Sequence, residues 1–232
     1  MSGGGTGIGL ACAEALTRAG AEVTVLGRRE APLRAAVEAG AAAKLLVADA
    51  TAPPELPGFA ILVNAAGTAV SLPFLKTTDA DFRAALDANL MTAVSLSRAV
   101  LPGMLAPGYG RIVNIASTAA LKGYAYVAPY VAAKHALLGF TRALALEVAS
   151  KGVTVNAICP GFTETPLLAE SIQRIAAKTG RDEAAARAEL AKHNPQGRLF
   201  QPREIAELAL YLCSDAAAGI HGAALPVSGG EI

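Results

Sequence analysis

Short apolar segments rich in β-branched residues alternate with helical patterns along the chain, and this alternation restricts the fold more than any other feature. Apolar residues recur at three- and four-residue spacing over residues 9–19, 80–105, 130–150 and 202–213. The intervening apolar runs lie at residues 23–26, 44–48, 60–63, 111–115, 153–158 and 223–227. Continuous runs of this kind are typical of strands buried on both faces of a parallel sheet. The order predicts an α/β fold with a doubly wound parallel sheet and helices on both faces.

The length and charge of the chain limit its organisation and its partners. A chain of 232 residues without a linker or an internal repeat is expected to form a single domain over residues 1–232. Its net charge of +1 gives no support for binding nucleic acid. No run reaches the roughly 18 apolar residues of a membrane span, and no secretory signal pattern is present, so we expect neither membrane association nor export. Cys12, Cys159 and Cys213 lack paired spacing, which predicts no metal site and a reducing cytoplasm.

One segment departs from the alternation of strands and helices. Residues 164–195 are polar and helix-prone, and they form a longer connection than is usual between a strand and a helix. Ligands of doubly wound sheets bind beyond the carboxyl ends of the strands, and this segment follows such an end. The segment is therefore a candidate substrate lid, and a surface insertion without a role in binding is the alternative.

A glycine-rich turn precedes the first helical pattern, which is how Rossmann-type folds hold a dinucleotide. Glycine lets the backbone approach a pyrophosphate, and the N-terminus of the following helix supplies N–H donors and partial positive charge. A flexible tail is the alternative, which the helical pattern directly after the turn disfavours. The predicted cofactor-binding residues of this turn are Gly3, Gly5, Thr6, Gly7, Ile8 and Gly9.

Two arginines follow the strand at residues 23–26, where an NAD site usually carries a carboxylate for the ribose hydroxyls. The guanidinium groups of Arg28 and Arg29 could instead bind a 2′-phosphate, which favours NADP(H) over NAD(H) without excluding the latter. A pair of solvated surface arginines is the alternative. Asp49 follows the strand at residues 44–48 and could accept a hydrogen bond from the adenine amino group or cap a turn.

Three side chains suit acid–base chemistry at a carbonyl group. Ser117 follows the strand at residues 111–115, and Tyr130 and Lys134 lie four residues apart, hence on one face of a helix. A free tyrosine has a pKa of about 10, too high for efficient acid–base work near neutrality, and an adjacent ammonium together with an oxidised nicotinamide would stabilise the phenolate. Lys134 is therefore expected to tune Tyr130, which would give or take the proton while Ser117 holds the carbonyl oxygen. Surface helices contain many Tyr–Lys pairs at this spacing, so the pair alone does not establish the chemistry.

The order of these motifs resembles that of the short-chain dehydrogenase/reductase family over nearly the whole chain. The matching features are the glycine turn, Asp49, Asn64-Ala65-Ala66-Gly67, Asn89, Asn114-Ile115-Ala116-Ser117, Tyr130-Val131-Ala132-Ala133-Lys134, and Pro160-Gly161 with Thr165. The resemblance implies an oxidoreductase that transfers a hydride between NAD(P)(H) and a carbonyl or secondary alcohol.

The resemblance also implies individual roles. Asn89 would complete a catalytic tetrad with Ser117, Tyr130 and Lys134 by holding a water chain to the lysine, and a structural role within its helix is the alternative. Lys134, with Tyr130 beside it, would contact the nicotinamide ribose. The residues implied on the adenosine side of the cofactor are Asn64, Ala65 and Gly67. Those implied at its carboxamide end are Pro160, Gly161, Thr163 and Thr165. Those implied to contact the substrate are Ser117, Tyr130, Phe162 and Leu167.

Three features depart from the family pattern. Ala65 replaces a usual asparagine and Ser228 a usual aspartate, and backbone groups can carry those contacts. Family members begin with an apolar strand before the glycine turn, whereas only Met1 precedes Ser2. That strand normally lies at the sheet centre, so its absence would leave two rows of backbone groups unpaired. We expect either that the functional gene product has a longer start or that this chain is destabilised.

The substrate is specified least well. The segment 164–195, with Pro195-Gln196-Gly197-Arg198 after it, resembles reductases and dehydrogenases of 3-oxoacyl and 3-hydroxyacyl thioesters. An NAD-dependent dehydrogenase of a sugar, steroid or cyclic alcohol is one alternative, and a non-catalytic dinucleotide-binding sensor or scaffold is another. The resemblance also implies a homotetramer in which the helices over residues 80–105 and 130–150 pack against symmetry mates.

Overall fold

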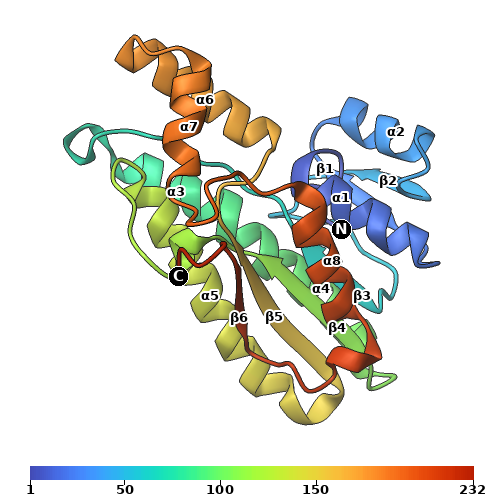
Figure 1. The fold of residues 1–232 in the computed structure, drawn as a ribbon. Helices are drawn as coiled ribbons and strands as arrows, with labels where there is room; N and C mark the ends of the chain where they lie inside the picture. The colour runs from blue at the N-terminus through green and yellow to red at the C-terminus, as the bar shows by residue number, and fades with distance from the viewer.

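The computed structural model describes residues 1–232, with the exception of the Thr179 side chain. Parallel strands form the centre of the molecule (Figure 1). The strands are β1 (Thr24–Gly27), β2 (Lys44–Val47), β3 (Ile61–Asn64), β4 (Gly110–Ile115), β5 (Val153–Pro160) and β6 (Ala224–Val227). Each coincides within two residues with an apolar run of the sequence, which confirms the predicted parallel α/β architecture.

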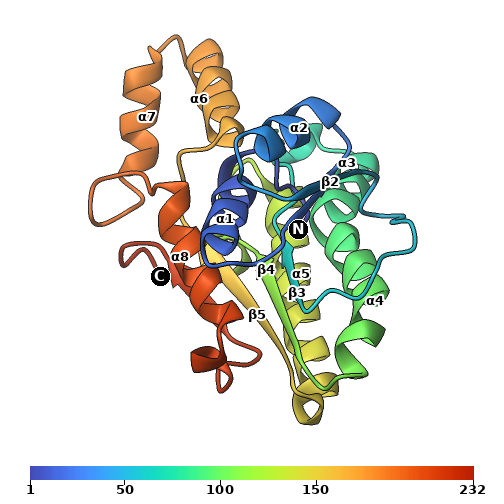
Figure 2. The ribbon, with the colours of Figure 1, turned by 90° about the vertical axis from the view of Figure 1, so that its right-hand side faces the viewer.

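Helices cover both faces of these strands, as Figure 2 shows. On one face α1 packs along α8, and on the other α4 and α5 lie against the sheet. The helices are α1 (Gly7–Arg18), α2 (Glu30–Glu38), α3 (Asp79–Leu86), α4 (Thr92–Leu105), α5 (Ala128–Val148), α6 (Pro166–Thr179), α7 (Glu183–Ala191) and α8 (Pro202–Cys213). The sequence pattern did not predict α2, and the helix predicted over residues 80–105 is divided in two by a π-turn at Asp87–Met91.

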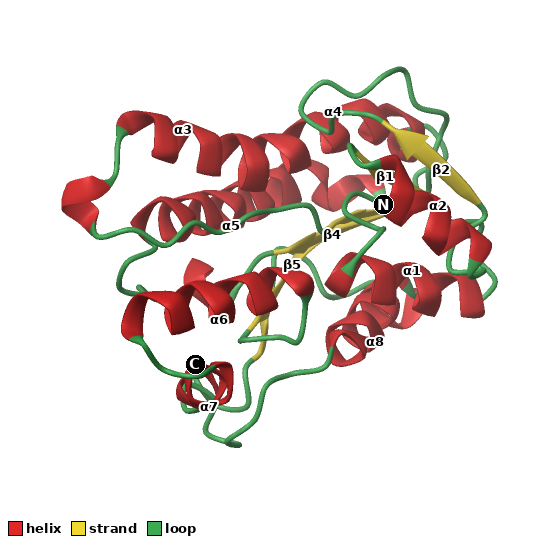
Figure 3. Ribbon diagram, turned by 90° about the horizontal axis from the view of Figure 1, so that it is seen from above, coloured by secondary structure: helices red, strands yellow, loops and turns green.

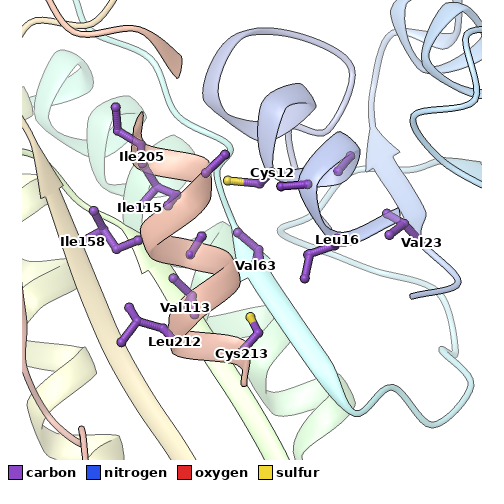
Figure 4. Close-up of a cluster of buried hydrophobic side chains, with 14 of the residues drawn as sticks. Cys12, Leu16, Val23, Val63, Val113, Ile115, Ile158, Ile205, Leu212 and Cys213 are labelled. Atoms are coloured by element: carbon purple, nitrogen blue, oxygen red, sulfur yellow. The ribbon is translucent and has the colours of Figure 1, made fainter. Parts of the chain in front are cut away.

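The core between α1, α8 and the strands explains why these helices form. Figure 4 shows Cys12 and Leu16 of α1 together with Ile205 and Leu212 of α8. These side chains pack against apolar side chains of β3, β4 and β5, which include Val113 of β4. Spacing of four and seven residues places each helical set on one face of its helix. The resulting contact fixes the start of α1, and with it the glycine turn, against the carboxyl ends of the strands.

Between β1 and β3 the chain supplies only its first residues. Ser2 forms a parallel bridge with Leu26 on one side and with Asn64 on the other, and the Met1 amine donates to the Thr24 carbonyl at 2.7 Å. The strands therefore form two hydrogen-bonded groups, β1-β2 and β3-β4-β5-β6. Along the same edges lies a slot lined by the apolar residues Met1, Leu26, Leu46, Leu56, Phe59, Ile61, Leu62, Leu96 and Val100. The central position that the family pattern assigns to a first strand is thus occupied here by Met1 and Ser2.

The segment predicted as an excursion forms a helical hairpin of α6 and α7 (Figure 1). Viewed from above in Figure 3, α6 lies over the ends of the central strands. Leu168 and Ile172 of α6 pack against Ala186 of α7 and against Leu199. Arg174 donates to the Ala69 carbonyl at 3.3 Å, which connects α6 to the loop after β3. This placement is the one required of a lid, and the function of the hairpin as a lid stays a proposal.

Candidate active site

The glycine turn folds tightly against the start of α1. Gly3 has a φ of +65°, a conformation that favours glycine. A Cβ on Gly9 would lie 2.2 Å from the Gly3 carbonyl oxygen, so a side chain there would not fit. The Ser2 hydroxyl accepts a hydrogen bond from the Ala66 N–H at 3.3 Å, which joins the turn to the loop after β3. The predicted pyrophosphate turn and the predicted adenosine loop therefore lie next to each other.

The start of α1 suits an anion. Thr6 is its N-cap and accepts no side-chain hydrogen bond, and the first turn contains no acidic residue. The N–H groups of Gly7, Ile8 and Gly9 belong to the first turn, where they have no intrahelical acceptor. Gly5 lies close to Pro32, where a Cβ would be 3.0 Å away, so the turn is also packed against α2. A pyrophosphate fits these donors, which agrees with the predicted cofactor site.

The arginines and Asp49 occupy the neighbouring edge. Arg28 and Arg29 are exposed after β1, and Arg29 is the N-cap of α2. Asp49 accepts hydrogen bonds from the N–H and the hydroxyl of Thr51, at 2.9 and 2.8 Å. These bonds, with a smaller contribution from Arg28, lower the pKa of Asp49. The sequence left two roles open for Asp49, a contact with the adenine amino group and a turn cap. The hydrogen bonds with Thr51 show that it caps the turn.

The asparagine at the end of β3 is used inside the protein. Asn64 is buried, and its Nδ2 donates to Asn114 Oδ1 at 2.8 Å. Asn114 in turn donates to the Thr141 hydroxyl at 2.9 Å. This chain of bonds connects β3 to β4 and β4 to α5, so the side chain of Asn64 holds the strands that carry the site. Ala65 and Gly67 follow it in the partly exposed loop beside the glycine turn.

Ser117, Tyr130 and Lys134 come together at the carboxyl end of β4. Ser117 follows Ala116 after the end of the strand, and its hydroxyl accepts from the Ala119 N–H at 3.1 Å. Lys134 is buried and donates to the Ile115 carbonyl at 2.9 Å. Its Nζ lies 5.7 Å from the centre of the Tyr130 ring. A side-chain hydrogen bond between Ser117 and Tyr130 acts on the pKa of the tyrosine, so the two hydroxyls are adjacent.

Burial governs the ionisation of this group. Burial raises the pKa of Tyr130, and the hydrogen bond with Ser117 opposes the rise only in part. Burial also lowers the pKa of Lys134 to about 8. Lys134 does not lower the pKa of Tyr130 here, because its ammonium is directed at the Ile115 carbonyl and is itself desolvated. Tyr130 is therefore protonated near neutral pH, which is the state needed to donate a proton.

Asn89 lies beside Lys134 because of the π-turn at Asp87–Met91. Its Nδ2 donates to the Thr68 and Ala85 carbonyls, both at 3.0 Å. Its Oδ1 is buried and has no hydrogen-bond partner among the described residues. A Cβ on Gly67 would lie 2.5 Å from this oxygen and 3.6 Å from Lys134 Nζ, so the three residues converge. The unpaired oxygen fits an acceptor for a bound water between Asn89 and Lys134, and π-turns often occur at functional sites.

The segment after β5 borders the same site. Pro160 ends β5 and Gly161 follows, with Thr163 Oγ1 donating to the Gly161 carbonyl at 2.9 Å. Thr165 is the N-cap of α6, and a Cβ on Gly7 would lie 3.2 Å from its methyl group. Of the residues predicted to cover the cofactor, Thr165 thus lies against the glycine turn. Phe162 and Leu167, the predicted apolar wall, are partly buried at the base of the hairpin.

A group of residues that the sequence analysis did not predict lies next to Ser117. Tyr124 OH is 2.6 Å from the Thr118 hydroxyl and donates to the Glu231 carboxylate at 2.5 Å. Lys122 pairs with the same carboxylate at 2.9 Å. The contacts of Glu231 with Tyr124 and Lys122 span more than a hundred residues of sequence, so no local pattern could have indicated them. His193 packs its ring against Phe162 and Tyr124.

The sequence predicted neither a metal site nor a membrane-spanning segment. Across the part of the chain described by the structure, no cluster of three or more histidine, cysteine, aspartate or glutamate side chains has a geometry suited to a metal ion. Among the same residues, no helix combines the length and the apolarity needed to cross a membrane.

Comparisons with known proteins agree with this geometry. Residues 3–231 match the family described as enoyl-(acyl carrier protein) reductase. A putative ketoacyl reductase of Streptomyces coelicolor is 37% identical over 99% of this chain and 95% of its own length. The chain belongs to the short-chain dehydrogenase/reductase family. It is therefore an NAD(P)-dependent oxidoreductase that acts on CH–OH and C=O groups.

Other members of the family show the range of its substrates. A D-beta-hydroxybutyrate dehydrogenase of Cupriavidus necator is 37% identical over 100% of this chain and 96% of its own length. The crystal structure of a variant of actinorhodin polyketide ketoreductase with NADPH superposes with a TM-score of 0.93 at 34% identity, covering 99% of this chain and 95% of that one. This short-chain dehydrogenase/reductase is thus similar both to reductases of ketoacyl compounds and to a dehydrogenase of a hydroxy acid.

Proposed function

We propose that the protein is an NADP(H)-dependent oxidoreductase whose substrate is a 3-oxoacyl or 3-hydroxyacyl thioester, or a related short-chain carbonyl compound. The observation that carries the reaction type is the convergence of Ser117, Tyr130 and Lys134 at the end of β4, next to the unpaired oxygen of Asn89. A protein that only binds a dinucleotide has no chemical need for these four residues together, which disfavours a sensor or scaffold.

The proposed reduction balances as one hydride and one proton added to a carbonyl group. The nicotinamide, when bound, supplies the hydride to the carbonyl carbon and becomes oxidised. Tyr130 donates its phenolic proton to the carbonyl oxygen, which Ser117 holds by a hydrogen bond, and the product is a secondary alcohol. Lys134 and Asn89 replace the proton on Tyr130 from solvent through bound water. In the oxidative direction each transfer is reversed.

The preference for NADP(H) rests on the end of β1. Arg28 and Arg29 are exposed there, and no acidic residue occupies positions 27–29. A 2′-phosphate would make charge-assisted hydrogen bonds with these guanidinium groups.

The thioester class is supported by the similarity to ketoacyl reductases and by the hairpin of α6 and α7, which extends over the carboxyl ends of the strands. A long acyl carrier needs an extended binding surface beyond the reacting carbonyl, and the hairpin offers one. The competing assignment is an NAD-dependent dehydrogenase of a sugar, steroid or cyclic alcohol, which uses the same catalytic residues.

Initial rates of reduced-cofactor consumption distinguish these assignments. The panel contains 3-oxoacyl thioesters of coenzyme A and acyl carrier protein, simple ketones and quinones, each with NADPH and with NADH. The reverse reaction is assayed with sugars, steroids and cyclic alcohols. We expect the highest kcat/KM with NADPH and a 3-oxoacyl thioester. A higher value for a sugar or cyclic alcohol with NAD would refute the thioester assignment, and tight cofactor binding without any turnover would support a sensor.

The proposal includes a homotetramer built through α4 and α5. Leu146 of α5 is 82% exposed and Leu105 of α4 is 40% exposed, so both helices present apolar side chains to solvent in the single chain. Light scattering coupled to size-exclusion chromatography is expected to give four times the chain mass. A monomer with full activity would contradict this part of the proposal.

A further inference from the structure

A carboxylate near the end of the chain is almost completely buried beside the catalytic residues. The side chain of Glu231 is 2% exposed. Its Oε1 accepts from the Tyr124 hydroxyl at 2.5 Å and from the Lys122 ammonium at 2.9 Å, and His193 Nδ1 lies 4.0 Å away. Its Oε2 is buried without a hydrogen-bond partner in the described part of the chain. Lys122 is therefore the main compensation for the negative charge of Glu231.

This cluster borders the place where a substrate would react. Thr118 directly follows Ser117, and its hydroxyl lies 2.6 Å from Tyr124 OH. The Tyr124 ring packs edge-on against Phe162, with centroids 5.9 Å apart. Tyr130 is near enough to Tyr124 to contribute to a raised pKa of Tyr124. The cluster therefore lies at the substrate end of the site, away from the glycine turn.

The hydrogen bonds in the cluster run in one direction. An ionised carboxylate only accepts, so Tyr124 donates to Glu231 and Thr118 donates to Tyr124. Burial, followed by the hydrogen bond to Glu231, raises the pKa of Tyr124, which keeps its hydroxyl protonated. The Tyr124 hydroxyl hydrogen is thus committed to Glu231 and the Thr118 hydroxyl hydrogen to Tyr124, and neither is left for a carboxylate on a substrate.

The cations of the neighbouring hairpin are also bonded to protein acceptors. Arg174 donates to the Ala69 carbonyl, Lys178 to the Ser71 carbonyl, and Arg187 pairs with the Glu164 carboxylate. Lys122 and Arg187 are thus already paired with protein carboxylates, whereas Arg174 and Lys178 are bonded to neutral carbonyl groups. A free carboxylate on a substrate would also approach the buried charge of Glu231, and like charges placed close together in a binding site are strongly unfavourable.

From this arrangement we propose that Glu231 is a specificity-determining residue, which by holding Lys122 and Tyr124 disfavours substrates with a free carboxylate and favours uncharged 3-oxoacyl compounds. The inference rests on the proposed function and makes it narrower. A 3-oxo thioester or ester is uncharged next to its ketone, whereas a free 3-oxo acid carries a full negative charge there. Glu231 would thus favour the reduction of thioesters over the reactions of free hydroxy and oxo acids.

Charge-neutralising variants give an ordered test. The measured quantity is the ratio of kcat/KM for acetoacetate to kcat/KM for methyl acetoacetate, with NADPH. Glu231→Gln keeps the shape of the side chain but releases Lys122, so we expect the ratio to rise about tenfold. Lys122→Gln leaves Glu231 uncompensated, and the ratio is expected to fall. The double variant carries neither charge, and its ratio is expected to return to near the wild-type value.

A matched control removes a carboxylate from an ion pair elsewhere. Glu207→Gln releases Arg18 from an exposed pair of 2.7 Å between α8 and α1, and it is expected to leave the ratio unchanged. An unchanged or lower ratio in Glu231→Gln would overturn the proposal. If Glu231→Gln does not fold, Lys122→Gln still tests the proposal, because Lys122 is partly exposed and its substitution is not expected to unfold the protein. An unchanged or higher ratio in Lys122→Gln would equally overturn the proposal.

Equilibrium binding separates this inference from the proposed function. Calorimetry on the complex with oxidised cofactor measures the affinities for 3-hydroxybutyrate and methyl 3-hydroxybutyrate without any turnover. The proteins compared are wild type, Glu231→Gln, Lys122→Gln and the double variant. The ratio of their affinities is expected to follow the same order as the kinetic ratio. Absence of turnover with every carbonyl compound would contradict the proposed function alone. Wild-type binding that prefers the free acid, or an order unaffected by the variants, would contradict the role of Glu231 alone.

Discussion

The ammonium group of Lys134 donates a 2.9 Å hydrogen bond to the carbonyl oxygen of Ile115, the last residue of β4. This bond connects the middle of the catalytic face of α5 to the strand that leads into Ser117. It fixes the distance between the helix that carries Tyr130 and the turn that carries Ser117. The positions of three catalytic candidates are therefore set by one contact between a helix and a strand end.

Burial of Lys134 predicts a pH-dependent cost to stability. Its pKa is about 8 in the folded protein, against 10.5 for an exposed lysine. Between these values the unfolded chain binds more protons, so the free energy of unfolding rises with pH across this window, by about 1.4 kcal/mol for each pKa unit. Urea titrations at pH 7.5 and pH 10 should show wild type gaining stability relative to Lys134→Met. A constant difference between the two proteins would contradict the desolvated lysine.

The exposed arginines after β1 predict a loss of cofactor discrimination. The double variant Arg28→Ala, Arg29→Ala should raise KM for NADPH by about tenfold to a hundredfold, because a charge-assisted hydrogen bond contributes about 1.5–3 kcal/mol. KM for NADH should change little. Arg34→Ala serves as a control, since Arg34 pairs with Glu30 within α2. Equal loss for the two cofactors would place the 2′-phosphate elsewhere.

The slot between β1 and β3 predicts that an added strand stabilises the chain. An extension of about five β-branched residues before Met1 would pair with both edges and remove the buried amine, whose pKa burial lowers to about 5. Each new hydrogen bond contributes about 1 kcal/mol, so Tm should rise by roughly 5 °C or more. A glycine–serine extension of equal length is the control. Equal Tm values for the two extensions would contradict the slot as a strand site.

The sequence predicted the strands and the catalytic set because both have local signals. The apolar runs that became β4 and β5 are continuous and β-branched, and Tyr130 and Lys134 share a helical face through their spacing alone. The break at Asp87–Met91 had no such signal, because a π-turn depends on the packing of Asn89 against Thr68. Asp49 was ambiguous for a related reason, since an acid after a strand can bind a ligand or cap a turn.

The cluster around Glu231 shows the other limit of sequence analysis. The carboxylate reaches Tyr124 across 107 residues, and nothing near either residue predicts the other. Spacing also indicates which groups lie near Tyr130 but not how deeply they are buried. Desolvation dominates the pKa of both Tyr130 and Lys134. Tertiary burial thus decides the chemistry that residue types only suggest.

The kinetics of Tyr130→Phe test the central claim most directly. The substitution removes one hydroxyl, and with it the proton donor, while it keeps the ring beside Lys134. We predict that kcat for reduction of a 3-oxoacyl thioester by NADPH falls by about 100-fold or more, because a positioned acid contributes on the order of 10²–10⁴ in rate. The dissociation constant for NADPH, measured by fluorescence titration, should stay within about twofold of wild type. Near wild-type turnover in Tyr130→Phe would contradict the assignment of Tyr130 as the catalytic acid.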